Sequence, residues 1–404
     1  MRISSNTLFD SNVAAMGQQQ TRLQQTQEQI ASGRKILTAS DDPVAAARAL
    51  EITQSDAVNT QYASNRGAAR HTLSLAESTL QSVTELIQDV RTTTVNAGNG
   101  SLNNGDRAAL ANGLRGRLQE LIGLANSTDG AGNYLFAGFQ SMTKPFVGTA
   151  AGMGYFGDDG QRLIQVSTGQ QMASSDSGAD IFMRIKNGNG TFLTQAAASN
   201  NGTGLVSTGS VVNPALLTGN SYSVAFSVVA GVTTYSVTNT STATVLSTGN
   251  PYVSGQAISF AGMQFDIQGA PANGDAFTVS PSSNESLFKT ISDLISALST
   301  SVPSPAAGGM TGLTNSLSRG LNHLDNALNN ILTTRSSLGL RLSEIDTLQT
   351  TGENLGLQLK QVLSELQDLD YSKAISELTM QQMQLQAAQQ SFARVQDLSL
   401  FKYI

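Results

Sequence analysis

Few side chains in this sequence have the type and spacing that chemistry requires. The two histidines, His71 and His323, stand in helical stretches, and neither has an acidic residue or a second histidine three or four positions further on. A metal site on a helix needs two ligands on one face, so neither histidine is predicted to bind a metal or to act as a base. The absence of cysteine excludes thiolate metal sites, disulfide bonds and cysteine nucleophiles. We therefore expect no catalytic residue, no metal and no cofactor, and we do not expect an enzyme.

Two further patterns match chemical motifs only in part. Residues 152–157 read G-x-G-x-x-G, but they lead into Asp158-Asp159-Gly160 and a strand-like segment, whereas a dinucleotide-binding loop must open a helix. We interpret this match as chance in a glycine-rich hairpin. Acidic pairs could serve glycoside chemistry or calcium binding, but helix caps, turns and boundaries account for each of them, and no EF-hand spacing surrounds them. These pairs are Asp41 with Asp42, Asp158 with Asp159, and Asp368 with Asp370.

The C-terminal part of the chain carries two apolar stripes that change register once. The first stripe steps by four and three, which places its members on one face of a helix. We assign it, together with three residues of an earlier helical stretch, to a helical core within the chain: Leu73, Leu80, Ile87, Leu355, Leu359, Val362, Leu366 and Leu369. The register changes at residues 368–370, where we expect a boundary between two layers of an assembly.

The second stripe has a weaker counterpart at the N-terminal end. Both repeat mainly every seven residues, and the companion positions of the N-terminal stripe are largely glutamine or other polar residues. Each apolar side chain that is buried contributes roughly 1.5–3 kcal/mol, too little over five positions to order thirty residues, so we predict an arm that is disordered until assembly. The five positions are Phe9, Met16, Leu23, Ile30 and Leu37. A helix docked on its own globular domain is the alternative. The predicted assembly residues are Phe9, Met16, Leu23, Ile30, Tyr371, Leu378, Leu385, Phe392, Val395 and Leu398.

The order of patterns along the chain is helices, strands, helices. Gly33 should end the first helix, Pro43 should begin a long second one, and Ala230-Gly231 and Ala261-Gly262 should turn two hairpins. We predict an α + β fold, in which both chain ends form a long, discontinuous coiled-coil bundle with an inserted all-β domain. The predicted parts are an assembly arm (1–40), two halves of a helical core domain (41–146 and 284–367), an outward β-rich domain (147–283) and a second arm (368–404).

Composition limits the partners. The net charge is −6 and only 13% of residues are charged, so no basic field is available for nucleic acid or an anionic membrane. No apolar run approaches the length of a membrane span, and residues 1–6 lack the apolar core of a signal peptide. We expect no nucleic-acid partner, no membrane insertion and no cleaved signal peptide.

Several segments resemble the flagellin-like family, over roughly residues 1–165 and 284–404 and only weakly across 187–265. They are residues 1–4 with Leu8 and Phe9, residues 30–36 (Ile-Ala-Ser-Gly-Arg-Lys-Ile), residues 40–47 (Ser-Asp-Asp-Pro-Val-Ala-Ala-Ala), residues 133–138 (Asn-Tyr-Leu-Phe-Ala-Gly) with Pro145 and Phe146, residues 274–279 (Gly-Asp-Ala-Phe-Thr-Val), and residues 368–374 (Asp-Leu-Asp-Tyr-Ser-Lys-Ala). Within the family, Pro43 and residues 134–138 are more similar to hook-associated members than to filament flagellin.

The resemblance implies a secreted, non-enzymatic adaptor that joins the flagellar hook to the filament. The implied partners are copies of the chain in a ring, a neighbouring hook-associated protein, flagellin, a flagellar export chaperone and the type III export apparatus. A filament flagellin is the nearest alternative. A surface adhesin that binds glycan through its uncharged β domain is the alternative from another class, since residues 187–265 contain no Asp, Glu, Lys or Arg.

Overall fold

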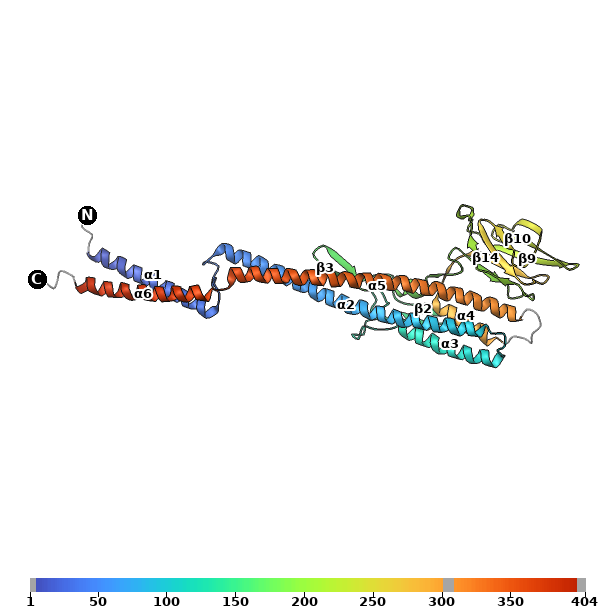
Figure 1. The fold of residues 1–404 in the computed structure, drawn as a ribbon, viewed down its shortest axis with the longest axis horizontal. Helices are drawn as coiled ribbons and strands as arrows, with labels where there is room; N and C mark the ends of the chain where they lie inside the picture. The colour runs from blue at the N-terminus through green and yellow to red at the C-terminus, as the bar shows by residue number, and fades with distance from the viewer. Residues whose placement is uncertain (1–4, 301–308, 398–404) are drawn as a thin grey trace. The chain divides into compact units, whose positions relative to one another are not determined.

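Helices occupy both ends of the chain and strands its middle (Figure 1). The computed structural model describes residues 5–300 and 309–397. Within these ranges the helices are α1 (Ser5–Ser32), α2 (Pro43–Ala97), α3 (Asn104–Ala125), α4 (Leu287–Ser299), α5 (Gly309–Gln367) and α6 (Tyr371–Asp397). The predicted fold class is confirmed, because terminal helices flank an inserted, all-β part.

The chain forms two compact units. The terminal unit comprises Met1–Asn65 and Thr347–Ile404, and the central unit comprises Arg66–Asp346. These divisions fall inside α2 and α5, so each of these helices contributes residues to both units. The boundaries expected for the two arms, at residues 40 and 368, do not coincide with these divisions. They lie in the breaks between α1 and α2 and between α5 and α6.

The end of α1 and the start of α2 lie where the sequence predicts. The N–H of Gly33 donates to the carbonyl of Gln29 at 2.9 Å, and Gly33 has a φ of +70°, a left-handed conformation that ends a helix. Pro43 is the first residue of α2, and the Asp42 carboxylate accepts the N–H of Ala45 at 3.0 Å. Both expected helix ends are therefore confirmed.

The break at residues 368–370 pairs with the break after α1. The N–H of Lys35 donates to the carbonyl of Gln367 at 2.7 Å, and the N–H of Leu369 donates to the carbonyl of Gly33 at 3.0 Å. A short antiparallel bridge thus replaces helical hydrogen bonds on both segments. The register change of the two C-terminal stripes is confirmed as a break between α5 and α6.

The helical part of the central unit is held by the middle of α2. Leu73, Leu80 and Ile87 are fully buried there. Farther along the chain, α3 packs on α4. An N-terminal capping box begins α3: the N–H of Asp106 donates to Asn103 at 3.0 Å and the N–H of Asn103 donates to Asp106 at 3.1 Å. No helix in the described ranges is long and apolar enough to cross a membrane.

Two sheets form the inserted β module, which we define as residues 188–282. One sheet has the strand order β11-β10-β9-β14-β6, and the other has the order β12-β13-β7, with β8 also paired to β13. The strands are β6 (Phe192–Ala196), β7 (Leu205–Val206), β8 (Ser210–Val211), β9 (Tyr222–Val229), β10 (Val232–Asn239), β11 (Thr244–Pro251), β12 (Ala257–Phe260), β13 (Met263–Gln268) and β14 (Ala276–Pro281). A 3₁₀ turn, Pro214–Leu216, precedes β9. Both expected hairpins, β9–β10 and β12–β13, are confirmed.

The β module has a hydrophobic core of its own. The buried side chains come from both sheets and include Phe192, Tyr222, Phe265 and Phe277. Alternate residues of β9 and β13 point into this core, as the two-residue period of a strand requires. The uncharged run in the sequence therefore lies on a module that folds around its own apolar interior.

Shorter strands precede and follow the module. They are β1 (Phe146–Thr149), β2 (Gly152–Tyr155), β3 (Leu163–Ser167), β4 (Gln170–Ala173), β5 (Ile185–Lys186) and β15 (Asn284–Glu285). The hairpin β1–β2 contains most of the G-x-G-x-x-G match, which confirms that this match lies in a hairpin and opens no helix. A π-helical turn, Ala179–Met183, connects β4 to β5.

Candidate assembly interface

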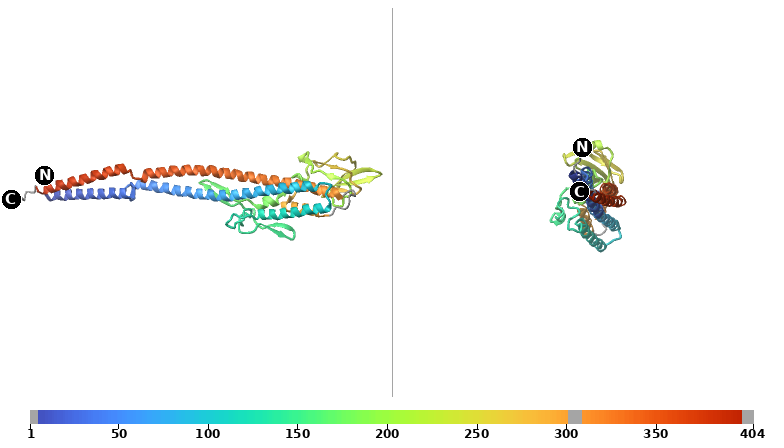
Figure 2. Two further views of the ribbon diagram at one scale, coloured as in Figure 1. Left: turned by 60° about the horizontal axis from the view of Figure 1, so that its bottom comes forward. Right: turned by 90° about the vertical axis from the view of Figure 1, so that its left-hand side faces the viewer.

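The helices α1 and α6 lie side by side in opposite directions (Figures 1 and 2). Near one end of the pair, the rings of Phe9 and Phe392 have centroids 5.3 Å apart. Toward the other end, the hydroxyl of Thr26 donates to Oε1 of Gln381 at 3.1 Å. The predicted pairing of the two terminal segments is therefore present within a single chain.

The pair buries its predicted residues only in part. Phe9 is 45% exposed and Tyr371 is 51% exposed. Six others are half-buried: Met16, Leu23, Ile30, Leu378, Leu385 and Phe392. Val395 and Leu398 have side chains outside the described residues. Among the described side chains of α1 and α6, only Thr26 and Ala374 are buried, so the pair has almost no dry core of its own.

A second apolar face of α6 points away from α1. Met380 is 53% exposed and Met383 is 59% exposed. Met380 follows Leu378 by two residues, which is a rotation of about 200° around a helix with 3.6 residues per turn. Val13 on α1 and Ile375 on α6 are also exposed. These residues lie outside the seven-residue stripes, so the sequence pattern did not select them.

The turn between α1 and α2 is fixed by one carboxylate. Oδ2 of Asp41 accepts the N–H groups of Leu37 at 3.0 Å and Thr38 at 2.8 Å. Its Oδ1 accepts Nε2 of Gln25 on α1 at 3.0 Å. The N–H of Thr38 is the largest influence that lowers the pKa of Asp41 from its ordinary value, because it stabilises the charged form. The predicted turn and cap roles of Asp41 and Asp42 are both observed.

In the terminal unit, glycines mediate the contact between α2 and α5. Gly352 and Gly356 are buried, and Nδ2 of Asn59 donates to the carbonyl of Gly352 at 2.8 Å. A Cβ on Gly356 would lie 3.2 Å from Nδ2 of Asn59, so the absence of a side chain allows this close approach. Leu355, one residue before Gly356, is turned about 100° away and is 45% exposed.

This arrangement differs from the predicted helical core. Leu73, Leu80 and Ile87 are fully buried, but Leu355 lies outside the buried interior of the single chain. The other members of that stripe, Leu359, Val362, Leu366 and Leu369, are half-buried. The four-and-three spacing predicts one shared helix face, whereas Gly352 and Gly356 form the close contact with α2 and the residues of the stripe are exposed or half-buried.

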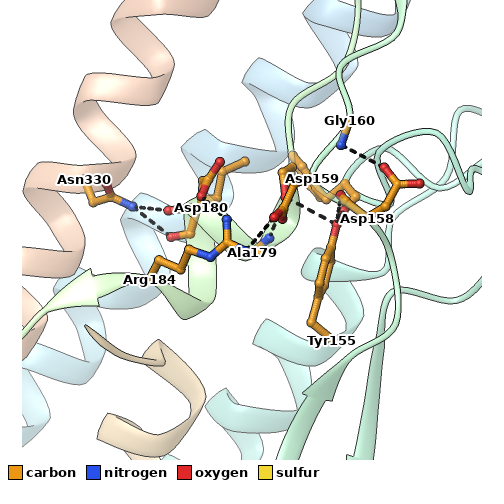
Figure 3. A network of polar contacts seen from close by, with 11 residues as sticks. Tyr155, Asp158, Asp159, Gly160, Ala179, Asp180, Arg184 and Asn330 are labelled. Carbon is orange, nitrogen blue, oxygen red and sulfur yellow. Dashed lines mark hydrogen bonds and ion pairs between the residues drawn. The ribbon is translucent and has the colours of Figure 1, made fainter. Parts of the chain in front are cut away.

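A polar network in the central unit holds the segment that resembles the flagellin-like family most specifically (Figure 3). The hydroxyl of Tyr155 lies 3.0 Å from the carbonyl of Phe136 and 2.9 Å from that of Asp158. Burial raises the pKa of Tyr155 above its ordinary value, which keeps the phenol a hydrogen-bond donor. Oδ1 of Asp158 accepts the N–H groups of Phe139 and Gly160, each at 2.8 Å. The turn role predicted for Asp158 is thus confirmed.

The same network reaches α5 through residues distant in sequence. Arg184 pairs with Asp159 at 2.7 Å and with Asp180 at 2.8 Å. Hydrogen bonding from Arg184 is the main cause that holds the pKa of Asp159 below its ordinary value. Nδ2 of Asn330 donates to the carbonyls of Asp180 at 2.9 Å and Ile181 at 3.0 Å (Figure 3). These contacts tie the π-helical turn to α5.

Further long-range pairs connect α5 to α2 and to the segment between β4 and the π-helical turn. Arg341 on α5 contacts both carboxylate oxygens of Asp176, at 2.8 and 3.0 Å, and both residues are largely buried. Arg335 contacts Glu77 on α2 at 2.7 Å. No sequence signal identified these partners, because each pair joins residues more than 160 positions apart.

The part of the chain that the structure describes contains no group of three or more histidine or acidic side chains that could hold a metal ion. His323 does have an acidic neighbour, Glu285, whose Oε1 lies 3.4 Å from Nδ1 of the ring. Local spacing could not show this neighbour, because it belongs to β15. The exposed and half-buried apolar residues of α1 and α6 are the candidate functional site.

Two family models match the chain. The bacterial flagellin N-terminal helical region matches residues 3–141, and the bacterial flagellin C-terminal helical region matches residues 321–404. The first match includes α1 and the second includes α6, so each contains one helix of the terminal pair. The fold and the terminal pair define the class of the protein as flagellin-like.

Individual relatives narrow this class. Flagellar hook-associated protein 3 of Salmonella typhimurium is 31% identical over 407 residues, which cover 100% of this chain and 99% of that protein. The crystal structure of the flagellar junction protein FlgL from Legionella pneumophila is 32% identical with a TM-score of 0.70, covering 80% of this chain and 100% of that one. A crystal structure of Xanthomonas campestris FlgL is also 32% identical, with a TM-score of 0.71, covering 78% of this chain and 99% of that one. The chain belongs to the flagellar hook-associated protein 3 (FlgL) family.

Proposed function

We propose that this chain is a non-enzymatic adaptor that joins the flagellar hook to the filament. Copies of it assemble into a ring through α1 and α6, between a neighbouring hook-associated protein and the first flagellin subunits. The relatives support this proposal, since they are named as hook-associated proteins and one is described as a flagellar junction protein. The place of action is the outside of the cell, at the distal end of the hook.

The exposed apolar residues of the terminal pair carry the proposal. Met380 and Met383 are more than half exposed, and the seven-residue stripe that faces α1 is itself only half-buried. Apolar side chains that follow one another along a helix lower the free energy when other helices cover them. Because α1 and α6 bury few side chains against each other, most of their apolar surface is covered only when neighbouring subunits pack on it. Contacts of this kind between subunits stabilise a ring.

The same property fits export before assembly. We propose that a flagellar export chaperone covers the terminal helices in the cell and that the type III export apparatus then takes the chain out without cleavage of a signal peptide. A segment that is only weakly stable alone costs little to unfold for passage. The absence of cysteine means that refolding outside requires no disulfide formation.

A single charge placed in the terminal pair tests this proposal. Leu385→Asp puts a carboxylate at a half-buried position, and Gln384→Asp places the same charge at the exposed neighbouring position. Burial of an unpaired charge is strongly unfavourable, so Leu385→Asp should abolish filament attachment while the central unit keeps its unfolding midpoint. Gln384→Asp should attach filaments normally. Normal swimming and filament length in the Leu385→Asp strain would contradict the proposal.

A deletion strain separates the adaptor from a filament subunit. Electron microscopy should show bare hooks, and flagellin should accumulate in the medium, because flagellin is made but has nothing to attach to. Capped hooks without shed flagellin would instead identify the chain as the filament subunit.

A further inference from the structure

The central unit contains a cavity between α5 and the edge of the β module. Its volume is about 490 Å³, within the range of about 300–1,000 Å³ that is typical of small-ligand sites. One wall is formed by β6 and the residues that follow it, and the opposite wall by the first half of α5. A second cavity of about 380 Å³, between α4 and α5, shares Ser316, Arg319 and His323 with the first.

The charged side chains in the described lining of the larger cavity have one sign only, which is positive. Among the described residues that line it, Arg319 alone has a permanent charge, and none is an aspartate or glutamate. Arg319 is a half-buried residue, and its guanidinium makes no hydrogen bond or ion pair with any residue that the structure describes. A guanidinium that is partly removed from water without a partner is costly. The larger cavity therefore has one positive charge and no carboxylate in its described lining, whereas Glu285, Lys289 and Asp293 line the smaller cavity that shares Arg319.

His323 lies one helical turn after Arg319, on the same face of α5. It is 4% exposed, and its Nδ1 faces Glu285 at 3.4 Å. Its Nε2 is buried and has no hydrogen-bond partner among the described residues. A buried polar atom without a partner, beside an unpaired guanidinium, marks this side of the cavity as incomplete.

The remaining walls offer hydrogen bonds but no stacking surface. In its described lining, the imidazole of His323 is the only aromatic side chain. Several polar side chains there have no hydrogen bond within the described part of the chain: Gln195, Thr208, Ser318 and Asn322. A neutral sugar usually needs an aromatic face in addition to such groups, whereas an anion can be held by the planar fork of one arginine and a few amides and hydroxyls.

We propose that this cavity binds a small ligand with a single carboxylate, held by Arg319. One permanent positive charge balances one carboxylate, whereas a phosphate dianion calls for more positive charge than the wall provides. The carboxylate belongs either to an acidic sugar or to an acidic peptide side chain, and the chemistry of recognition is the same for both. The proposal concerns the central unit and does not depend on the junction role.

Binding is tested with the purified full-length protein at pH 7 by calorimetry and saturation-transfer NMR. The probes are glucuronate and N-acetylglutamate α-amide, and their neutral counterparts are glucose and N-acetylglutamine amide. At least one carboxylate probe should bind at least tenfold more tightly than its neutral counterpart, and the tighter of the two identifies the source. Equal binding of a neutral counterpart, equal binding of inorganic phosphate, or no binding of either carboxylate would overturn the proposal.

Variants assign the binding to Arg319. Arg319→Gln should weaken carboxylate binding at least tenfold, and Arg319→Lys should weaken it less, because lysine keeps the charge and loses the planar fork. The control is Arg48→Gln, which removes the same charge from an exposed position on α2. Unchanged binding in both Arg319 variants would contradict the assignment, even if one of them were less stable.

Discussion

At the scale of single residues, Gly138 is fixed by its surroundings. It has a φ of +69°, and a Cβ built there would overlap the carboxylate and the carbonyl of Asp158. The residues just before it, Leu135 to Ala137, are buried. The segment that resembles hook-associated proteins most specifically is therefore also one in which the backbone leaves no room for a side chain.

Gly138→Ala should lower the free energy of unfolding by roughly 2–4 kcal/mol, since left-handed strain and steric overlap add. Gly130→Ala is the matched control, because Gly130 has a φ of +80° with no atom near the added Cβ. That control should cost about 1–2 kcal/mol, from the backbone alone. Denaturant unfolding measures both values, and equal losses would show that the overlap with Asp158 is relieved at no cost.

A second residue-scale feature responds to pH. Burial alone would raise the pKa of Glu285, but the hydrogen bond to His323 and the charge of Lys289 outweigh burial and hold this pKa below its ordinary value. A carboxyl with a lowered pKa in the folded state binds fewer protons than in the unfolded state. It therefore stabilises the fold above its unfolded pKa, and this contribution is lost as the pH falls through the folded pKa.

Glu285→Gln should consequently destabilise the protein most between pH 5 and 7 and least near pH 3. Urea unfolding of wild type and variant across this range measures the difference. Glu377→Gln, at an exposed position on α6, should leave the unfolding free energy unchanged at every pH. A difference between Glu285→Gln and wild type that grew toward acidic pH would contradict the sign.

At the scale of elements, the terminal helices differ from the central ones in burial. The described side chains of α1 and α6 include only two that are buried, Thr26 and Ala374, whereas the middle of α2 presents a fully buried row. Helices without a buried face are marginal in water, because packing supplies most helical stability. The pairing of α1 with α6 thus has a defined geometry but contributes little to the free energy of folding.

Limited proteolysis should therefore cut the free protein before about residue 40 and after about residue 368, and leave the central unit intact. The same segments should be protected in the assembled flagellum, where neighbouring subunits cover them. Mass spectrometry of the fragments locates the cuts. Equal resistance of α1 and the middle of α2 in the free protein would show that the pair is stable without assembly.

At the scale of the whole molecule, the β module is inserted through two adjacent strands. The N–H of Asn187 donates to the carbonyl of Ser283 at 3.1 Å, and the N–H of Ser283 donates to Oδ1 of Asn187 at 3.0 Å. The module is joined to the rest of the central unit at this one pair of strands and has its own apolar core. An element with these properties can be removed with little effect on the fold that carries it.

Replacement of residues 188–282 by a short glycine linker should leave a protein whose helical part still unfolds cooperatively. Circular dichroism and thermal unfolding test this expectation. If the module serves only to bind a ligand or a surface, the strain should still attach filaments and swim, while carboxylate binding is lost. Loss of filament attachment with an intact helical fold would show that the module itself takes part in the junction.

The sequence by itself determined the local features: helix ends at Gly33 and Pro43, hairpins at Ala230-Gly231 and Ala261-Gly262, and the register change at residues 368–370. Each depends on the conformational preference of one or two residues or on the period of an apolar stripe, which adjacent residues encode completely. The family resemblance was also carried by contiguous segments, so it could be recognised without the fold.

Only the tertiary structure decided which distant residues meet. Arg341 with Asp176, Arg184 with Asp159, and His323 with Glu285 have no sequence pattern in common, because the path of the chain alone brings them together. The outward position of Leu355 has the same origin. Its stripe specifies a helix face, but the close approach of α2 at Gly352 and Gly356 decides how deeply that face is buried.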